Sequence, residues 1–192
     1  MKMLKTSIIA LFVAAIAGCA AGVNFKKMTG DQLVLGKTTK DAVVASMGKP
    51  TGKGTNTFNG VELDIINYAY AKVGGDAALP GVTPARSQGF LFKNGVLVGK
   101  EFTSSFAADS TLFDIEKAKT VVKGQTKDQV VSLLGAPQGE YLYPIIEDQN
   151  GHAYVYMFTQ TKGFKSKSDV FVVEFDQNDV VTKTKLSSTG QL

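Results

Sequence analysis

Two side chains in this chain of 192 residues have chemistry that no other residue type supplies, and each occurs once: the thiol of Cys19 and the imidazole of His152. A general base needs a positioned partner, and a metal site needs several ligands. His152 directly follows Asn150-Gly151, a pair typical of turns. With one histidine and no second thiol, neither kind of site can be assembled around His152. We interpret it as a polar loop residue and predict no cofactor and no bound metal.

A second pattern with chemical meaning is Gly36-Lys37-Thr38-Thr39, which matches the end of a phosphate-binding loop. The full loop also has a glycine five residues before Gly36 and a strand ahead of it. The chain has Asp31 at that place, so a capped helix start is the better interpretation. No serine lies in a nucleophile-elbow motif either. The sequence therefore predicts a protein that is not an enzyme.

The position of Cys19 indicates what its thiol does. Lys2 and Lys5 precede ten apolar residues, 8–17, which is the charged-then-apolar layout of a secretory signal. A membrane-spanning helix needs about 20 apolar residues, so this run is too short to span. Ile16-Ala17-Gly18-Cys19 resembles the lipobox that bacterial lipoprotein signal peptidase reads. That resemblance implies cleavage before Cys19 and attachment of acyl chains, palmitate among them, to this cysteine.

We therefore predict a signal peptide over residues 1–18 and an acylated tether over residues 19–28. Ala20, rather than an aspartate, follows the cysteine. By resemblance to enterobacterial lipoproteins, this implies an outer-membrane location facing the periplasm. Removal of residues 1–18 takes away two lysines and no acid, so the formal net charge falls from +4 to +2. The remainder has no long basic run, which argues against a nucleic-acid partner and leaves the lipid anchor as the predicted membrane contact.

The elements that position these side chains repeat along the chain. Residues 39–50 read TKDAVVASMGKP and residues 126–137 read TKDQVVSLLGAP, identical at seven of twelve positions without a gap. A Tyr-x-Tyr pattern follows at residues 68–70 and again at residues 154–156. Because order and spacing are kept, we predict a tandem duplication, with one repeat over residues 29–108 and the other over residues 109–192.

Each repeat is expected to contain two helices followed by a three-stranded antiparallel meander, which is an α+β fold. Either Thr38 or Thr39, and Thr126 in the second repeat, are natural N-caps, and Gly48 and Gly135 suit a helix end with positive φ. The expected short first helices are residues 31–35 and 114–122. The expected strands are residues 64–73, 89–93, 96–103, 153–161, 169–176 and 180–186.

This arrangement resembles the BamE (SmpA/OmlA) family of outer-membrane lipoproteins. The residues that carry the resemblance are Gly124-Gln125-Thr126, Val130 and Gly135-Ala136-Pro137, with Gly36-Lys37-Thr38 and Gly48-Lys49-Pro50 in the first repeat. The resemblance implies a non-enzymatic scaffold that binds protein partners such as barrel-assembly components, in outer-membrane protein assembly or envelope integrity. The tandem arrangement also looks like the β-lactamase-inhibitor proteins, which implies an alternative: a protein inhibitor or ligand-binding module.

Candidate partner-binding residues lie on the hairpin around Asn94-Gly95, a dipeptide that is the strongest kind of short hairpin signal. A two-residue turn pairs Phe92 with Leu97 and Phe90 with Gly99, and places those four residues on one face. An antiparallel sheet normally presents a polar face to water, so an apolar opposite face is expected to be covered by the other repeat or by a partner. The candidates on that opposite face are Leu91, Val98 and Phe102.

Phe164 is a further candidate, in the short connection of residues 162–168. It lies beside the basic residues Lys162, Lys165 and Lys167. An aromatic ring among lysines suits lipid headgroups or an acidic partner, and the alternative is a solvated hairpin tip.

Overall fold

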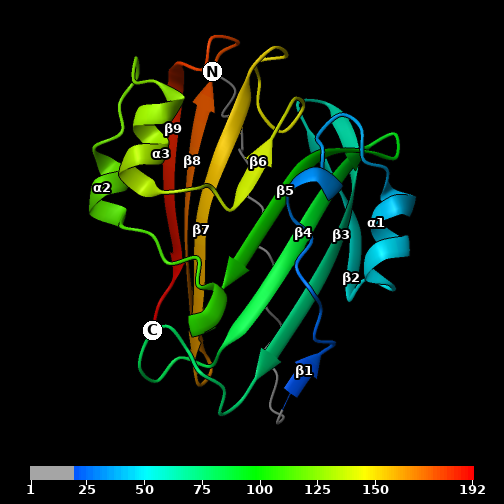
Figure 1. The fold of residues 1–192 in the computed structure, drawn as a ribbon, viewed down its shortest axis with the longest axis vertical. Helices are drawn as coiled ribbons and strands as arrows, with labels where there is room; N and C mark the ends of the chain where they lie inside the picture. Colours follow the sequence, from blue (N-terminus) through cyan, green and yellow to red (C-terminus); the bar gives the residue numbers. More distant parts are fainter. Residues whose placement is uncertain (1–19) are drawn as a thin grey trace, which may run out of the picture.

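The computed structural model describes residues 20–192, so Cys19 and the predicted signal peptide lie outside the described residues. Within this range the chain forms three α-helices, two 3₁₀ turns and one antiparallel sheet of nine strands (Figure 1). The helical elements are η1 (Gly30–Gln32), α1 (Lys40–Met47), η2 (Ala107–Asp109), α2 (Ile115–Lys119) and α3 (Lys127–Leu134). The strands are β1 (Ala20–Gly22), β2 (Gly52–Phe58), β3 (Val61–Lys72), β4 (Ala85–Lys93), β5 (Val96–Ser104), β6 (Gly139–Tyr141), β7 (His152–Lys162), β8 (Lys165–Phe175) and β9 (Val181–Gly190).

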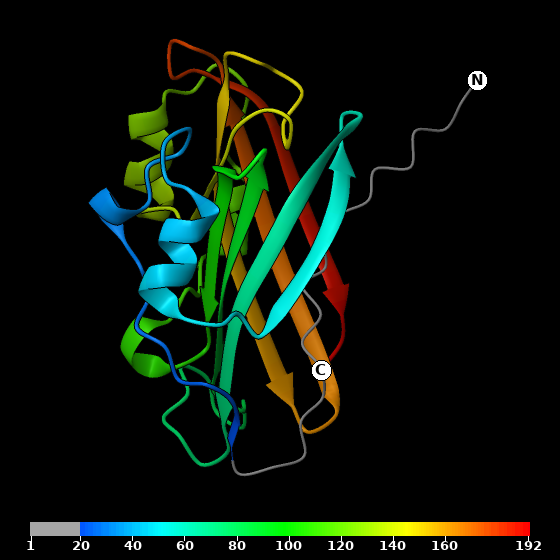
Figure 2. The same cartoon turned by 90° about the vertical axis from the view of Figure 1, so that its right-hand side faces the viewer.

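The sheet continues from the first half of the chain into the second. Its order is β1-β3-β4-β5-β6-β7-β8-β9, and β2 pairs with the edge of β3 that β1 also uses. Figure 2 shows α1, α2 and α3 on one face of this sheet, so the other face carries no described helix. We call this second surface the helix-free face. The α+β class is confirmed, with a much larger sheet than expected.

The structure has fewer helical residues and more strands than the sequence pattern predicts. Residues 31–35 do not form an α-helix: η1 starts at Gly30, whose φ is +53°, and is followed by a turn at residues 35–37 that contains Gly36 with φ of +75°. α2 is also shorter than expected, at five residues. β2 has the sequence GKGTNTF, with little β propensity, and it forms because all seven of its residues pair with β3.

Short-range hydrogen bonds fix the ends of α1 and α3. The hydroxyl of Thr39 accepts a hydrogen bond (3.2 Å) from the backbone N–H three residues later, and Thr126 forms the predicted capping box with Gln129. Gly48 and Gly135 end the two helices with φ of +78° and +81°. Positive φ at both glycines confirms that prediction, and Thr39 rather than Thr38 is the cap of α1.

The same two kinds of contact attach α1 and α3 to the sheet. The Tyr68 hydroxyl donates to the carbonyl of Gly48 (2.7 Å), and the Tyr156 hydroxyl donates to the carbonyl of Gly135 (3.0 Å). At the other end, the first backbone N–H of each helix donates to a carbonyl in a hairpin turn, at 2.9 Å for α1 and 2.8 Å for α3. Each helix is therefore held at its start by a turn and at its end by a tyrosine.

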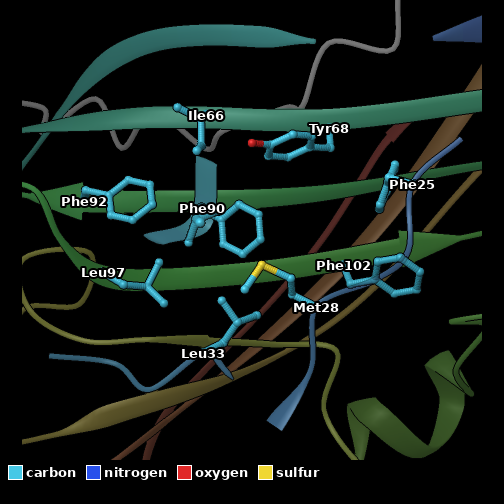
Figure 3. Close-up of a cluster of buried hydrophobic side chains, with 10 residues drawn as sticks. Phe25, Met28, Leu33, Ile66, Tyr68, Phe90, Phe92, Leu97 and Phe102 are labelled. Carbon is cyan, nitrogen blue, oxygen red and sulfur yellow. The ribbon is translucent and has the colours of Figure 1, made fainter. Parts of the chain in front are cut away.

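Apolar clusters fill the space between the helices and the sheet. The first lies around Phe90 and includes Phe25 and Met28 from the segment before η1 (Figure 3). The second lies around Tyr156, with side chains of β7, β8, α2 and α3. Because side chains alternate across a strand, the residues between those of the first cluster point to the helix-free face. A third, smaller cluster there is formed by Leu63, Leu91 and Val98.

Valine at Gly48 or at Gly135 should lower the free energy of unfolding by about 1–3 kcal/mol, because both glycines combine a positive φ with an extended ψ, a conformation that essentially only glycine adopts. No atom lies within 4 Å of a Cβ built at either glycine, so the cost arises from the positive φ and not from a clash. Urea unfolding of each variant measures it. Gly54→Ala, in β2 with ordinary φ and equally open space, is the control and should be nearly neutral. Equal stability of the wild type and both valine variants would contradict the assigned helix ends.

Candidate interaction surfaces

The register of the β4–β5 hairpin decides which way the predicted partner-binding residues point. Phe92 pairs with Leu97, as predicted. A β-bulge then shifts the register, so that Phe90 pairs with Lys100 and not with Gly99. A shift of one residue moves every later side chain of a strand to the other face. The faces predicted for β5 are therefore correct up to the bulge and reversed after it.

Phe102 lies beyond this bulge and points toward the helices. The prediction that it lies on the outer face is wrong, because an extra residue of β5 is accommodated at the bulge. Its ring is 1% exposed, in the cluster that contains Phe25 and Met28, and Figure 3 shows it beside these two side chains. The ammonium group of Lys27 lies 4.1 Å from the ring centroid. Phe102 is thus a core residue of the chain itself.

Leu91 and Val98 lie on the helix-free face, as predicted, and are buried there. The residues that cover them from the second half of the chain are Tyr141, Leu142 and Ile145. Gly99 permits this cover, because a Cβ at that position would lie 2.4 Å from Cδ1 of Ile145. Contact within the chain, which is one of the two expected kinds of cover, therefore accounts for the burial of both residues.

Phe164 has the opposite environment. It occupies the turn between β7 and β8, where Lys162 pairs with Lys165, and its side chain is 93% exposed. Both lysines are exposed as well. Among the four predicted partner-binding residues, Phe164 is the one that a partner or a lipid surface reaches without rearrangement of the fold.

The described part of the predicted tether is packed against the sheet. β1 pairs with β3, and both Phe25 and Met28 are buried. The side-chain amide of Gln88 accepts a hydrogen bond from the backbone N–H of Met28 (3.0 Å) and donates one to its carbonyl (2.8 Å). The guanidinium of Arg86 donates to the carbonyl of Phe25 (2.6 Å). Residues 20–28 are therefore part of the folded body and not a free tether.

A buried carboxyl group lies where β5 meets β6. Glu101 pairs with Gly89 on one side and with Gly139 on the other, and the Tyr141 hydroxyl donates to its Oε2 at 2.5 Å. Burial raises the pKa of the Glu101 carboxyl, and the hydrogen bond from Tyr141 offsets this in part. A Cβ at Gly89 would lie 2.9 Å from Oε1, so glycine makes room for the carboxyl group. The sequence analysis did not predict the contact between Glu101 and Tyr141. Gly89 and Gly139, two glycines outside any turn, were a signal for it.

His152 is the first residue of β7 rather than a loop residue. Its ring stacks on Phe175 with centroids 5.2 Å apart, and its Nε2 lies 3.3 Å from a carboxyl oxygen of Asp179. The ammonium group of Lys127 hydrogen-bonds to Asp179 and lowers the pKa of its carboxyl, while burial lowers the pKa of His152. Residues 20–192 contain no group of three or more potential His, Cys, Asp or Glu metal ligands. These contacts fasten the turn before β9 to the start of α3.

Comparison with known proteins finds a family match within the second half of the chain. Residues 110–185, from just before α2 into β9, match the family model described as the outer membrane protein assembly factor BamE domain. The BamE resemblance predicted from the sequence is confirmed over these residues. No curated protein matches the sequence. None of the helices in residues 20–192 is long and apolar enough to cross a membrane.

One solved structure that matches this chain in part is a protein from Streptococcus mutans described as a "putative beta-lactamase inhibitor protein". The two chains are 13% identical with a TM-score of 0.41, and the similarity covers 78% of this chain and 82% of that chain.

Replacement of Phe102 by serine should lower the free energy of unfolding by about 3–5 kcal/mol, because it removes an aromatic ring from the core and buries a hydroxyl group. Phe164→Ser is the matched control. Its ring is 93% exposed, so the same chemical change should alter stability by about 0.5 kcal/mol or less. Thermal and urea unfolding measure both. Similar losses for the two variants would show that Phe102 is not in the core.

The buried carboxyl group predicts a pH dependence of stability. The folded state holds the proton of Glu101 more tightly than the unfolded chain does, since the folded pKa is raised from an ordinary value of 4.5. The resulting stabilisation is complete below that value and is lost as the pH rises through the raised pKa, with a slope of up to about 1.4 kcal/mol per pH unit.

Glu101→Gln should remove this loss, so that the free energy of unfolding falls less with rising pH than in the wild type. Tyr141→Phe should make the fall larger, because the hydrogen bond that stabilises the carboxylate is gone. Urea unfolding at a series of pH values above 4.5 compares the three proteins. Parallel curves for the wild type and Glu101→Gln would refute the assigned environment.

Proposed function

We propose that this protein is a non-enzymatic outer-membrane lipoprotein whose folded part is a periplasmic scaffold for protein partners in outer-membrane protein assembly or envelope integrity. The observation that carries the proposal is the match of residues 110–185 to the assembly-factor BamE domain. Acyl chains on Cys19, one residue before β1, hold the scaffold at the membrane. The partner is a component of the barrel-assembly machinery or another envelope protein.

The scaffold is a tandem duplication of one unit, with copies at residues 29–108 and 109–192. Support for this comes from the aligned segments 39–50 and 126–137, and from the contacts that recur with them. Tyr68 and Tyr156 each donate to the glycine that ends a helix, Gly48 and Gly135. A copied segment retains such a pair of interactions together, whereas two unrelated helices have no reason to share both. In the first copy the first helix is reduced to η1. β2 stands where the second copy has β6, because each strand begins two residues after the proline that follows the helix and pairs with the next strand.

The helix-free face is the surface that the scaffold offers to a partner. On β8, Val173 and Phe175 belong to the helix-side cluster, so Val172 and Glu174 point to the helix-free face. Glu174 forms an ion pair with Lys183 of β9, in which Oε1 and Nζ are 3.5 Å apart. A half-buried valine beside a charged pair provides both apolar area and polar contacts, and protein interfaces combine the two. The opposite face is occupied by α1, α2 and α3 (Figure 2).

Site-specific photo-crosslinking in cells tests this proposal. A photoreactive amino acid at Val172 should crosslink to a barrel-assembly component or another envelope protein, identified by mass spectrometry. The same amino acid at Ala45 in α1 or Ser132 in α3, both exposed on the helix side, is the control and should give little of that product. A crosslink to a soluble enzyme would favour the alternative function, a protein inhibitor, over the scaffold. Equal yields from all three positions would refute the choice of face.

A further inference from the structure

One end of the sheet brings together three segments that are far apart in the sequence. Ala20 of β1 pairs with Lys72 at the end of β3, and the backbone N–H of Lys72 donates to the carbonyl of Pro84 (3.0 Å). The backbone N–H of the preceding residue, Thr83, donates to the carbonyl of Thr161 at the end of β7 (2.8 Å). This row of contacts leads from the start of the described chain to the β7–β8 turn. Figures 1 and 2 both show these segments at the lower end of the molecule.

This end combines an exposed aromatic ring with exposed ammonium groups. Phe164 is 93% exposed at the β7–β8 turn, and Val73, just after β3, is 58% exposed. Three exposed lysines surround them: Lys72, Lys162 and Lys165. None of these lysines is in an ion pair with another residue of the described chain 20–192.

The acidic residues near this end do not cancel that charge. Asp169 is held by Lys167 at 2.9 Å, and Asp109 is held by Arg86 at 3.1 Å. Asp76, in the β3–β4 connection, is exposed. Among the side chains at this end, three exposed lysines against one exposed carboxylate leave an excess of positive charge around an apolar tip. Such a surface matches a lipid interface, where phosphates attract lysines and an aromatic ring enters between headgroups.

We propose that this end of the sheet docks on the lipid surface to which Cys19 is attached, with Phe164 inserted among the headgroups and Lys72, Lys162 and Lys165 against phosphates. This inference rests on the proposed lipid anchor. Consecutive Cα atoms are about 3.8 Å apart, so Cys19 is one step from Ala20, which strand pairing holds at this same end. The acyl chains therefore leave the protein beside the docking surface. In this orientation the ends of the strands face the membrane, and the helix-free face remains accessible to partners.

The absence of tryptophan from the chain makes a direct test possible. Phe164→Trp in the full acylated protein introduces a single tryptophan at the tip. The protein is reconstituted in vesicles of phosphatidylcholine and phosphatidylglycerol in equal parts, with or without bromine on the phosphatidylcholine acyl chains. In brominated vesicles this variant should lose more than half of its emission. The companion variant with Lys162→Glu and Lys165→Glu in the same chain should lose much less, because repulsion lifts the tip from the phosphates.

Val122→Trp is the matched control. Val122 is 58% exposed and precedes Gly124, whose backbone N–H donates to the carbonyl of Val181, at the end of the sheet opposite the β7–β8 turn. Its emission should be nearly unchanged by bromine. If the acylated protein floats with the vesicles and the two tryptophans are quenched equally, docking is refuted and the anchor stands. If Cys19→Ala floats as well as the wild type does, the anchor is refuted, and bromine quenching of the tryptophan at position 164 in that variant then decides docking by itself.

Discussion

The sheet crosses from one half of the chain to the other through β6, whose three residues pair with β5 on one side and with β7 on the other. Neighbouring strands must lie about 4.7–4.9 Å apart for this ladder to form. At Gly139 a Cβ would lie 2.7 Å from the carbonyl oxygen of Lys100 and 3.1 Å from the Cβ of Val155. Glycine is therefore required at the junction. These hydrogen bonds set the orientation of the two halves together with the apolar cover of Leu91 and Val98 and the hydrogen bond from Thr83 to Thr161.

Several other features follow from this shared sheet. Both helix-side clusters lie on the same face, so the second face stays free of described helices. The segment after β6 passes over that free face and covers Leu91 and Val98, so the second half of the chain protects apolar surface of the first. Glu101 and Tyr141 meet beside the junction (2.5 Å). Burying a carboxyl group is unfavourable unless it is hydrogen-bonded, and Tyr141 provides that bond within the same pair of strands.

The N-terminal segment links this body to its proposed location. Gln88 and Arg86 project from β4 and bind the backbone of Met28 and Phe25, so residues just after Cys19 are held as firmly as a strand. The end proposed to face lipid and the helix-free face are perpendicular surfaces of one sheet, because one is formed by the ends of the strands and the other by their side chains. Membrane docking and partner binding can therefore occur together without competition.

The parts of this protein that local interactions determine could be predicted from the sequence by itself. Thr39, Thr126, Gly48 and Gly135 bound α1 and α3 as predicted, and the Asn94-Gly95 turn and the BamE resemblance are present, since caps and tight turns depend on residues within about four positions. Tertiary structure decided the rest. β6 pairs with β5 from the first half of the chain. The bulge in β5 reverses the face of Phe102, and residues 20–28 are packed by side chains from β4. Strand register and burial are set by the energies of distant contacts, which spacing along one strand does not contain.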